Sequence, residues 1–270
     1  MSLRSPGEAL TREGLAVLVR NRPEVDPDLP AVLFVHGAMD RAASFSRVMR
    51  RLPGFNLLAL DRRGYAGSLP AGVCASLENH VDDLVGVIDY SGASSVVVIG
   101  HSLGGTLALG LAARADPRVK GVGVFEAPMP SLDNSYALVG GGAIECGDEE
   151  GPEAAAEFFY RLMVGEATWN RLRERDRAAR RSEGPALLAE LRSLRTPGST
   201  VDPHSISLRV MMGVGSETRR SMAESSNLLQ LALPCSEMFV INGAGHGAHL
   251  SHADEFARYV KACVGLATQL

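Results

Sequence analysis

The chain contains no apolar run long enough to cross a membrane. A transmembrane helix needs about 20 consecutive apolar residues, and no stretch of the 270-residue sequence approaches that length. The N-terminal segment MSLRSPGEALTREG also lacks the apolar centre of a signal peptide. We therefore expect a protein that has no membrane partner and works in the cytoplasm.

Cysteine is scarce, and its spacing argues against the usual cysteine sites. The chain has four cysteines with no C-x-x-C pair among them: Cys74, Cys146, Cys235 and Cys263. We expect reduced thiols rather than a disulfide framework. An excess of charge of one sign is also missing, since 27 basic and 31 acidic residues give a formal net charge of -4. This balance indicates no nucleic-acid partner.

What the sequence does contain is a repeated alternation of short apolar runs and helical patterns. Seven runs read as continuous apolar stretches rich in β-branched residues, which is typical of strands buried on both faces. The alternation predicts an α/β fold with a mostly parallel central sheet and helices on both faces. The predicted strands lie within 14–20, 31–37, 55–61, 94–100, 119–127, 207–215 and 237–243.

One stretch interrupts this alternation. No convincing strand occurs within 131–204, where a glycine-rich segment precedes several helical patterns. We predict a helical insertion over 131–204 in a core formed by 1–130 and 205–270. Because open α/β sheets bind ligands at the carboxyl edge of their strands, such an insertion could form a lid there. The low apolar periodicity around 140–151 predicts a mobile hinge.

A single serine stands at the corner between a predicted strand and a helix. The segment VVVIGHSLGGTLALG places Ser102 between Gly100 and Gly104, in the pattern G-x-S-x-G. A turn this tight strains the backbone at the serine, and the flanking glycines avoid collisions with neighbouring elements. The unpaired N–H groups at the start of the helix would lie beneath the hydroxyl. Ser102 is therefore our candidate nucleophile, in preference to an ordinary helix N-cap.

A serine hydroxyl needs a general base before it can attack. The candidates are the seven histidines: His36, His80, His101, His204, His246, His249 and His252. We choose His246, because it lies on a glycine-flanked loop between the last predicted strand and the final helix. The spacing H-G-A-H-L-S-H also raises the question of a metal, but no cysteine or carboxylate cluster stands nearby in the sequence to complete a site. We expect neither a metal ion nor a cofactor.

Four motifs occur in the order found in one fold family. FVHGAM begins at Phe34, DRRGYAGS at Asp61, GHSLGG at Gly100 and GAGHGAHL at Gly243. In that order they resemble the His-Gly loop, the D-x-R-G-x-G-x-S loop, the nucleophile elbow and the histidine loop of the α/β-hydrolase family. The second motif departs from the family at Ala66, where glycine is usual. The resemblance spans nearly the whole chain and implies an α/β-hydrolase fold.

The resemblance also implies an oxyanion hole built from two backbone N–H groups. One belongs to Leu103, directly after the nucleophile, and the other to Ala38, which follows His36 and Gly37. Such donors stabilise the charge that develops in a tetrahedral intermediate. We expect His36 to brace its loop and His101 to pack rather than react.

The remaining group of a serine triad is a carboxylate that orients the imidazole. Much of the family has an aspartate after the strand that follows the insertion, but this chain has Ser216 there. Two replacements remain open. Glu217 is the next residue, whereas Glu126 ends the strand after the elbow helix, where a subset of the family including haloalkane dehalogenases carries its acid. We favour Glu126, because an acid at the carboxyl end of a buried strand is unusual as ordinary surface.

Together these residues predict a cofactor-independent serine hydrolase that acts on a carboxylic ester or related acyl compound. The serine argues against dehalogenase and epoxide hydrolase chemistry, for which the family uses aspartate. The same residues would serve a C–C hydrolase, a lyase or a haloperoxidase, and a non-catalytic ligand receptor or signalling protein on this fold is a further alternative. The expected partner is a small-molecule acyl substrate, and the oligomeric state stays open.

Overall fold

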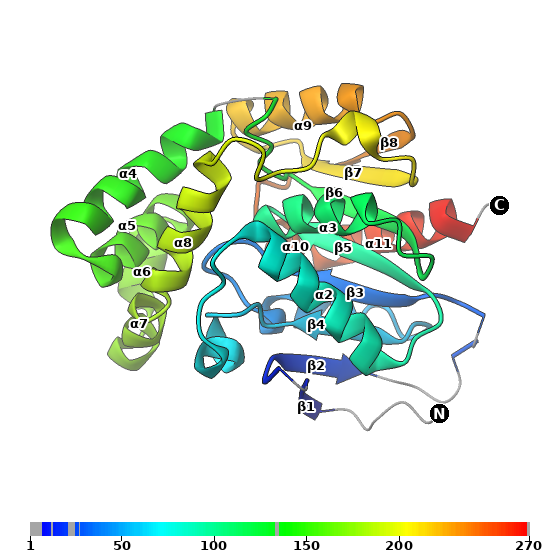
Figure 1. The fold of residues 1–270 in the computed structure, drawn as a ribbon, viewed down its shortest axis with the longest axis horizontal. Coiled ribbons are helices and arrows are strands. Elements are labelled where there is room, and N and C mark those ends of the chain that lie inside the picture. Colours follow the sequence, from blue (N-terminus) through cyan, green and yellow to red (C-terminus); the bar gives the residue numbers. More distant parts are fainter. Residues whose placement is uncertain (1–6, 12, 21–24, 27, 133–134, 269–270) are drawn as a thin grey trace.

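The computed structural model describes residues 7–11, 13–20, 25–26, 28–132 and 135–268 (Figure 1). Its centre is one sheet of eight strands. Their order across the sheet is β1 (Gly7–Leu10), β2 (Ala16–Arg20), β4 (Leu57–Leu60), β3 (Ala31–Val35), β5 (Val96–His101), β6 (Val119–Phe125), β7 (Val210–Gly215) and β8 (Ser236–Ile241).

The sheet is mostly parallel, as predicted. The β1–β2 and β2–β4 pairs are antiparallel, and every other neighbouring pair is parallel. The seven strands predicted from apolar runs are confirmed as β2 to β8. Strand β1 was not predicted, because its four residues, GEAL, carry no apolar run.

Both faces of the sheet are buried, which explains why the central strands show no polar alternation. On β3, Leu33 and Val35 belong to one apolar core, whereas Val32 and Phe34 belong to the other. Since successive side chains of a strand point to opposite faces, each face needs its own cover. Helices α2 (Leu77–Ser91), α3 (Leu103–Ala113) and α9 (Arg220–Ala232) cover the first core, and α1 (Ser46–Met49) and α11 (Ala253–Thr268) cover the second.

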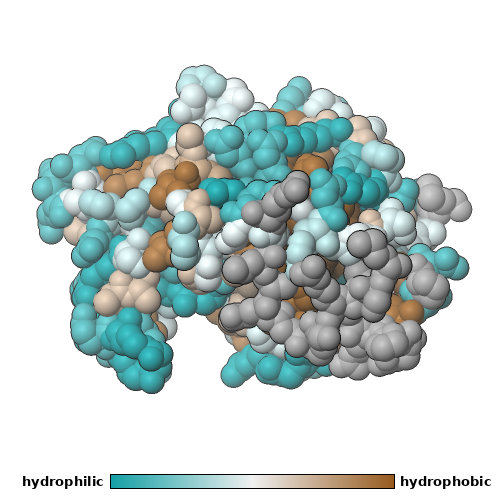
Figure 2. All heavy atoms as spheres, turned by 60° about the horizontal axis from the view of Figure 1, so that its bottom comes forward, coloured by the Kyte–Doolittle hydropathy of each residue, from teal (hydrophilic) through white to brown (hydrophobic). Residues whose placement is uncertain are grey.

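Between β6 and β7 the chain forms a separate group of helices beside the ends of the strands (Figure 1). They are α4 (Ser135–Glu150), α5 (Pro152–Val164), α6 (Glu166–Arg171), α7 (Glu174–Arg181) and α8 (Gly184–Arg195). Their apolar core, which includes Ala155 and Leu187, also contains Met39 and Tyr65 from loops of the sheet domain. Figure 2 shows that the surface is indented between this group and the sheet.

The mobile hinge expected around residues 140–151 is wrong, because α4 is helical as far as Glu150. A Cβ atom at Gly142 would lie 3.0 Å from the ring of Phe158, and one at Gly147 would lie 2.7 Å from the side chain of Leu188. The glycines therefore let α4 pack closely against α5 and α8. No helix among the described residues combines the length and apolarity that a membrane span requires.

Candidate active site

Ser102 lies at a sharp corner between β5 and α3, with φ 53° and ψ −128°. A positive φ is strained for a residue with a side chain. Two backbone hydrogen bonds maintain the conformation. The Ser102 N–H donates to the Phe125 carbonyl at 2.8 Å, and the Ser102 carbonyl accepts from the Gly105 N–H at 2.7 Å. The strained corner expected from G-x-S-x-G is therefore observed.

Close backbone approach explains the glycines around this corner. A Cβ atom at Gly100 would lie 2.2 Å from the Gly104 carbonyl oxygen, and one at Gly104 would lie 2.1 Å from the carbonyl oxygen of Val35. A Cβ atom at Gly37, in the loop after β3, would lie 2.8 Å from Cβ of Ser102. Glycine at position 100 therefore lets β5 and α3 meet closely, and glycine at positions 37 and 104 lets the end of β3 and its loop approach the serine corner.

His246 comes from the loop between β8 and α10 (Ala248–Ser251). Its Nδ1 lies 2.6 Å from Oε2 of Glu126, directly after β6. Glu126 is fully buried and His246 is partly exposed. Because Nδ1–H donates to the carboxylate, Nε2 keeps the lone pair that a general base uses. Ser102 and His246 line the same cavity. No hydrogen bond joins their side chains in the described structure.

The Glu126 carboxylate is held on both oxygens. The Gly215 N–H donates to Oε1 at 2.9 Å, and the Thr218 hydroxyl donates to Oε2 at 2.9 Å. Glu126 itself has a positive φ of 47°, so its backbone turns sharply where the strand ends. Sequence reasoning missed Thr218, for which the only available signal was its place in the loop after β7.

The other candidate acid lies elsewhere. Glu217 is exposed, and its backbone N–H donates to the Ala244 carbonyl at 2.8 Å. Ser216, which replaces the aspartate common in the family, accepts a hydrogen bond from the Gly243 N–H at 2.8 Å. The structure therefore brings Glu126, and not Glu217, to the imidazole of His246.

The residues of the two predicted oxyanion donors both border the smaller cavity at Ser102. Leu103 is the first residue of α3, whose first N–H groups have no partner within the helix. Ala38 follows Gly37 and lines both cavities that meet at Ser102. Neither N–H donates a backbone hydrogen bond within the described residues.

His36 braces the loop that carries Ala38, as expected. Its Nε2 accepts a hydrogen bond from the Arg62 backbone N–H at 2.9 Å, so Nδ1 is the protonated nitrogen, and it donates to the Gly37 carbonyl at 2.7 Å. Burial, together with the nearby Arg62 guanidinium, lowers the pKa of His36 to about 3. The ring therefore stays neutral at physiological pH.

Two further histidines lie near His246: His101 packs against its ring, and His249 packs against His101. His101 Nε2 lies 2.8 Å from the His246 carbonyl oxygen, and its ring centroid lies 4.6 Å from that of His246. Burial, with His249 nearby, holds the pKa of His101 well below its ordinary value. His249 Nε2 lies 3.2 Å from Oδ2 of Asp40. As expected, His101 packs in the site, and it also supports the backbone of His246.

Two groups among the described residues have a composition and spacing that could hold a metal ion. They are Asp40, His101 and His249, and Cys74, His80 and Asp83. In both groups the carboxylate already has protein partners. Asp40 accepts from Ser44 and is bonded to His249, and Asp83 is paired with Arg63.

Ser102 opens onto two cavities of different size and character. The larger, about 440 Å³, is lined by His246, Arg41 and Arg180 as well as apolar residues. The smaller, about 40 Å³, is bordered mainly by apolar side chains such as Leu103 and Met222. Phe159 and Met163 of α5 border both. Helices of the inserted group thus form part of the wall around the serine.

Comparison with known proteins agrees with this architecture. Lipase LipV of Mycobacterium tuberculosis (strain ATCC 25618 / H37Rv) is 33% identical over 110 residues, 40% of this chain and 41% of the lipase. An epoxide hydrolase of Caballeronia sordidicola is 36% identical over 110 residues, 39% of this chain and 33% of that protein. The matched stretch thus spans less than half of either relative.

Similarity of fold extends over nearly the whole chain. A thermophilic esterase from Thermogutta terrifontis superposes with a TM-score of 0.71 at 21% sequence identity, covering 98% of this chain and 99% of the esterase. A family model described as "Alpha/beta hydrolase family" matches residues 32–259. The chain therefore belongs to the alpha/beta hydrolase family.

Proposed function

We propose that the protein is a cofactor-independent serine hydrolase of carboxylic esters or related acyl compounds, with Ser102, His246 and Glu126 as its triad. The observation that carries the proposal is the 2.6 Å contact between His246 Nδ1 and the buried Glu126 carboxylate. It fixes the tautomer in which Nε2 can accept a proton, beside a serine whose backbone is held in a strained turn.

The reaction follows from these positions. Ser102 Oγ attacks the carbonyl carbon while His246 Nε2 takes its proton, and the Leu103 and Ala38 N–H groups stabilise the oxyanion. His246 then protonates the leaving group as the acyl enzyme forms. A water molecule, deprotonated by His246, releases the acyl group by the same route. Glu126 stabilises the imidazolium at both stages.

We further propose that residues 131–204 act as a lid on a core formed by 1–130 and 205–270. The support is that α5 supplies Phe159 and Met163, and α7 supplies Arg180, to the cavity that contains Ser102. A lid of this kind would limit the substrate to a small or medium molecule.

All four cysteines are free thiols, which supports a cytoplasmic location.

Among the alternatives, epoxide hydrolysis has the least support, although several relatives carry that name. In this family that chemistry uses an aspartate nucleophile, and position 102 is serine. A non-catalytic receptor would not need a carboxylate on the imidazole, so the Glu126–His246 contact favours the enzyme. C–C hydrolysis, lyase and haloperoxidase activities would use the same residues.

A fluorophosphonate probe tests the proposal directly, because it reacts with activated serines. We expect stoichiometric labelling of Ser102, loss of labelling in Ser102→Ala, and turnover of short-chain p-nitrophenyl esters by the native protein. Folded protein that neither reacts with the probe nor hydrolyses any ester of the series would contradict the assignment.

A further inference from the structure

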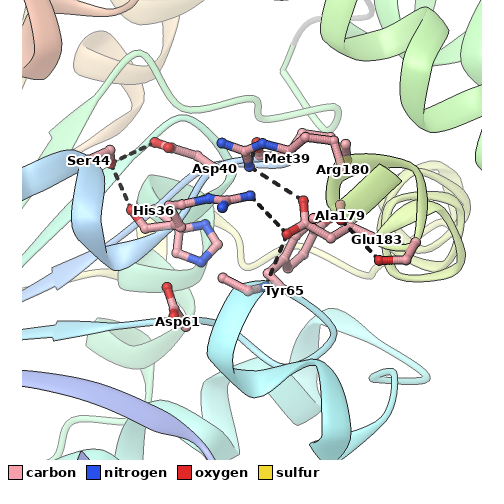
Figure 3. A network of polar contacts seen from close by, with 12 residues as sticks. His36, Met39, Asp40, Ser44, Asp61, Tyr65, Ala179, Arg180 and Glu183 are labelled. Carbon is pink, nitrogen blue, oxygen red and sulfur yellow. Dashed lines mark hydrogen bonds and ion pairs between the residues drawn. The ribbon is translucent and has the colours of Figure 1, made fainter. Parts of the chain in front are cut away.

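Two arginines of the larger cavity share one carboxylate. Arg41, between β3 and α1, places Nη2 3.1 Å from Oε1 of Glu183. Arg180, in α7, places Nη1 3.4 Å from Oε2 of the same residue (Figure 3). The Glu183 side chain is 2% exposed, and its Oε1 also accepts from the Ala66 N–H at 3.0 Å. One negative charge therefore faces two positive charges.

The two guanidinium groups retain unused donors. A guanidinium has five N–H donors and no acceptor. Arg41 donates to Glu183 alone within the described structure, and its Nε is buried without a partner. Arg180 donates to Glu183 and, at 2.7 Å, to the Met39 carbonyl. The Arg41 side chain is 29% exposed and lines the larger cavity, so its remaining Nη–H groups can donate to a further acceptor there.

The neighbouring acids have hydrogen-bond partners of their own. Asp40 accepts from the Ser44 hydroxyl at 3.1 Å (Figure 3). Its Oδ2 also lies 3.2 Å from His249 Nε2. Asp61 accepts from the Ala42 N–H at 2.7 Å and from the Gly67 N–H at 3.1 Å. Burial, with the Arg180 charge nearby, lowers the pKa of Arg41. An added anion beside Arg41 and Arg180 would reduce the repulsion between their two positive charges.

We propose that Arg41 and Arg180 form a subsite for a carboxylate of the substrate, which is then an ester or lactone bearing a second, ionised carboxyl group. The proposal rests on the proposed hydrolase function. A planar guanidinium fork matches a carboxylate in geometry. Because His246 must reach the leaving group and lines the larger cavity, the carboxylate belongs to the leaving group. The small apolar cavity takes the acyl chain.

The substrate preference tests this assignment with a matched pair of esters, 4-acetoxybenzoate and its neutral methyl ester. We expect the native protein to prefer the anion in kcat/KM. In Arg41→Gln and in Arg180→Gln, the ratio of anionic to neutral kcat/KM should fall about 10- to 100-fold, as for loss of a charged hydrogen bond. The control is Arg173→Gln, whose side chain is 76% exposed and pairs with Asp176; it should keep the native ratio.

Binding separates failure of the subsite from failure of the hydrolase. Calorimetry on Ser102→Ala protein should show 4-hydroxybenzoate binding more tightly than 4-hydroxybenzamide, with the difference lost in the added Arg41→Gln exchange. Arg41→Lys, which keeps the charge, should recover part of this difference in affinity. It replaces Arg41→Gln in the test if the glutamine variant does not fold. Hydrolysis of the neutral ester with no preference for the anion would overturn the subsite alone. If inorganic phosphate inhibits hydrolysis of the anionic ester more strongly than 4-hydroxybenzoate does, the assignment of the subsite to a carboxylate would be overturned.

Discussion

The orientation of His246 depends on one residue at the end of β6. Glu126 holds Nδ1 of the imidazole at 2.6 Å, and glutamine at this position would keep the shape but not the charge. We expect Glu126→Gln to lower kcat for a p-nitrophenyl ester by about 10³- to 10⁴-fold, because the imidazole loses its tautomer and its counter-charge. Steady-state kinetics on the folded variant measures this.

The matched control is the competing acid. Glu217 is exposed and lies outside the contacts of His246, so Glu217→Gln should retain kcat to within about twofold. A large loss in Glu217→Gln together with an active Glu126→Gln would reverse the assignment of the acid.

The Thr218 hydroxyl connects to the proposed triad through Glu126. Its hydroxyl donates to Oε2, the oxygen that also faces His246. Loss of a hydrogen bond to a charged group costs about 1.5–3 kcal/mol, so Thr218→Val should lower kcat by about tenfold or more. Thr218→Ser should restore most of the activity, and a valine variant as active as the native protein would show that the bond has no role in catalysis.

At the scale of elements, one buried ion pair joins α8 to the sheet domain. The Glu190 carboxylate of α8 pairs with the Arg62 guanidinium from the loop after β4, and both side chains are 1% exposed. The Tyr65 hydroxyl donates to Glu190 Oε2 at 2.7 Å, and His80 Nε2 lies 3.0 Å from Glu190 Oε1. The helical group is thus fixed to the core through polar as well as apolar contacts.

Removing the charge of Glu190 should therefore destabilise the protein. Loss of one partner of a buried pair costs about 3–5 kcal/mol, because the other charge remains buried. We expect Glu190→Gln to lower the free energy of unfolding by an amount in that range, measured by chemical denaturation. The control is Asp148→Asn, which breaks the exposed 2.5 Å pair between α4 and Arg192 of α8 and should cost less than about 1 kcal/mol.

The same pair predicts a pH dependence of stability. Burial alone would raise the pKa of Glu190, but Arg62 and His80 lower it to about 2 from an ordinary value of 4.5. As the pH falls, the unfolded chain takes up the proton first, so the native state loses relative stability. The contribution of the ionised Glu190 carboxylate to the free energy of unfolding is complete above about pH 4.5, and it is lost as the pH falls from there to about 2.

A comparison of unfolding free energies isolates this term. The difference between the native protein and Glu190→Gln should be constant above about pH 4.5 and shrink below it. A difference that stays constant down to the acid limit of folding would show that folding does not lower the pKa of Glu190.

At the scale of the whole molecule, the sequence was most informative where each residue had one dominant role. The buried strands were predictable because both faces of the sheet are covered, and the elbow because Gly100 and Gly104 have no room for a side chain. The α4 helix was not predictable, because its glycines are explained by close contact with α5 and α8, and local periodicity cannot show such a contact. The role of Thr218 depends on two loops far apart in the chain.

The Arg62 side chain also links α8 to the loop beside the serine. Besides Glu190, it donates to the His36 carbonyl at 2.9 Å and to the Gly37 carbonyl at 3.0 Å, which directly precede Ala38. A swing of α8 would therefore pull on the loop beside the serine and disturb it. We expect α8 to serve as the fixed pivot of the helical group, with molecules entering past the end of α5, where Val164 lines the cavity and is 41% exposed.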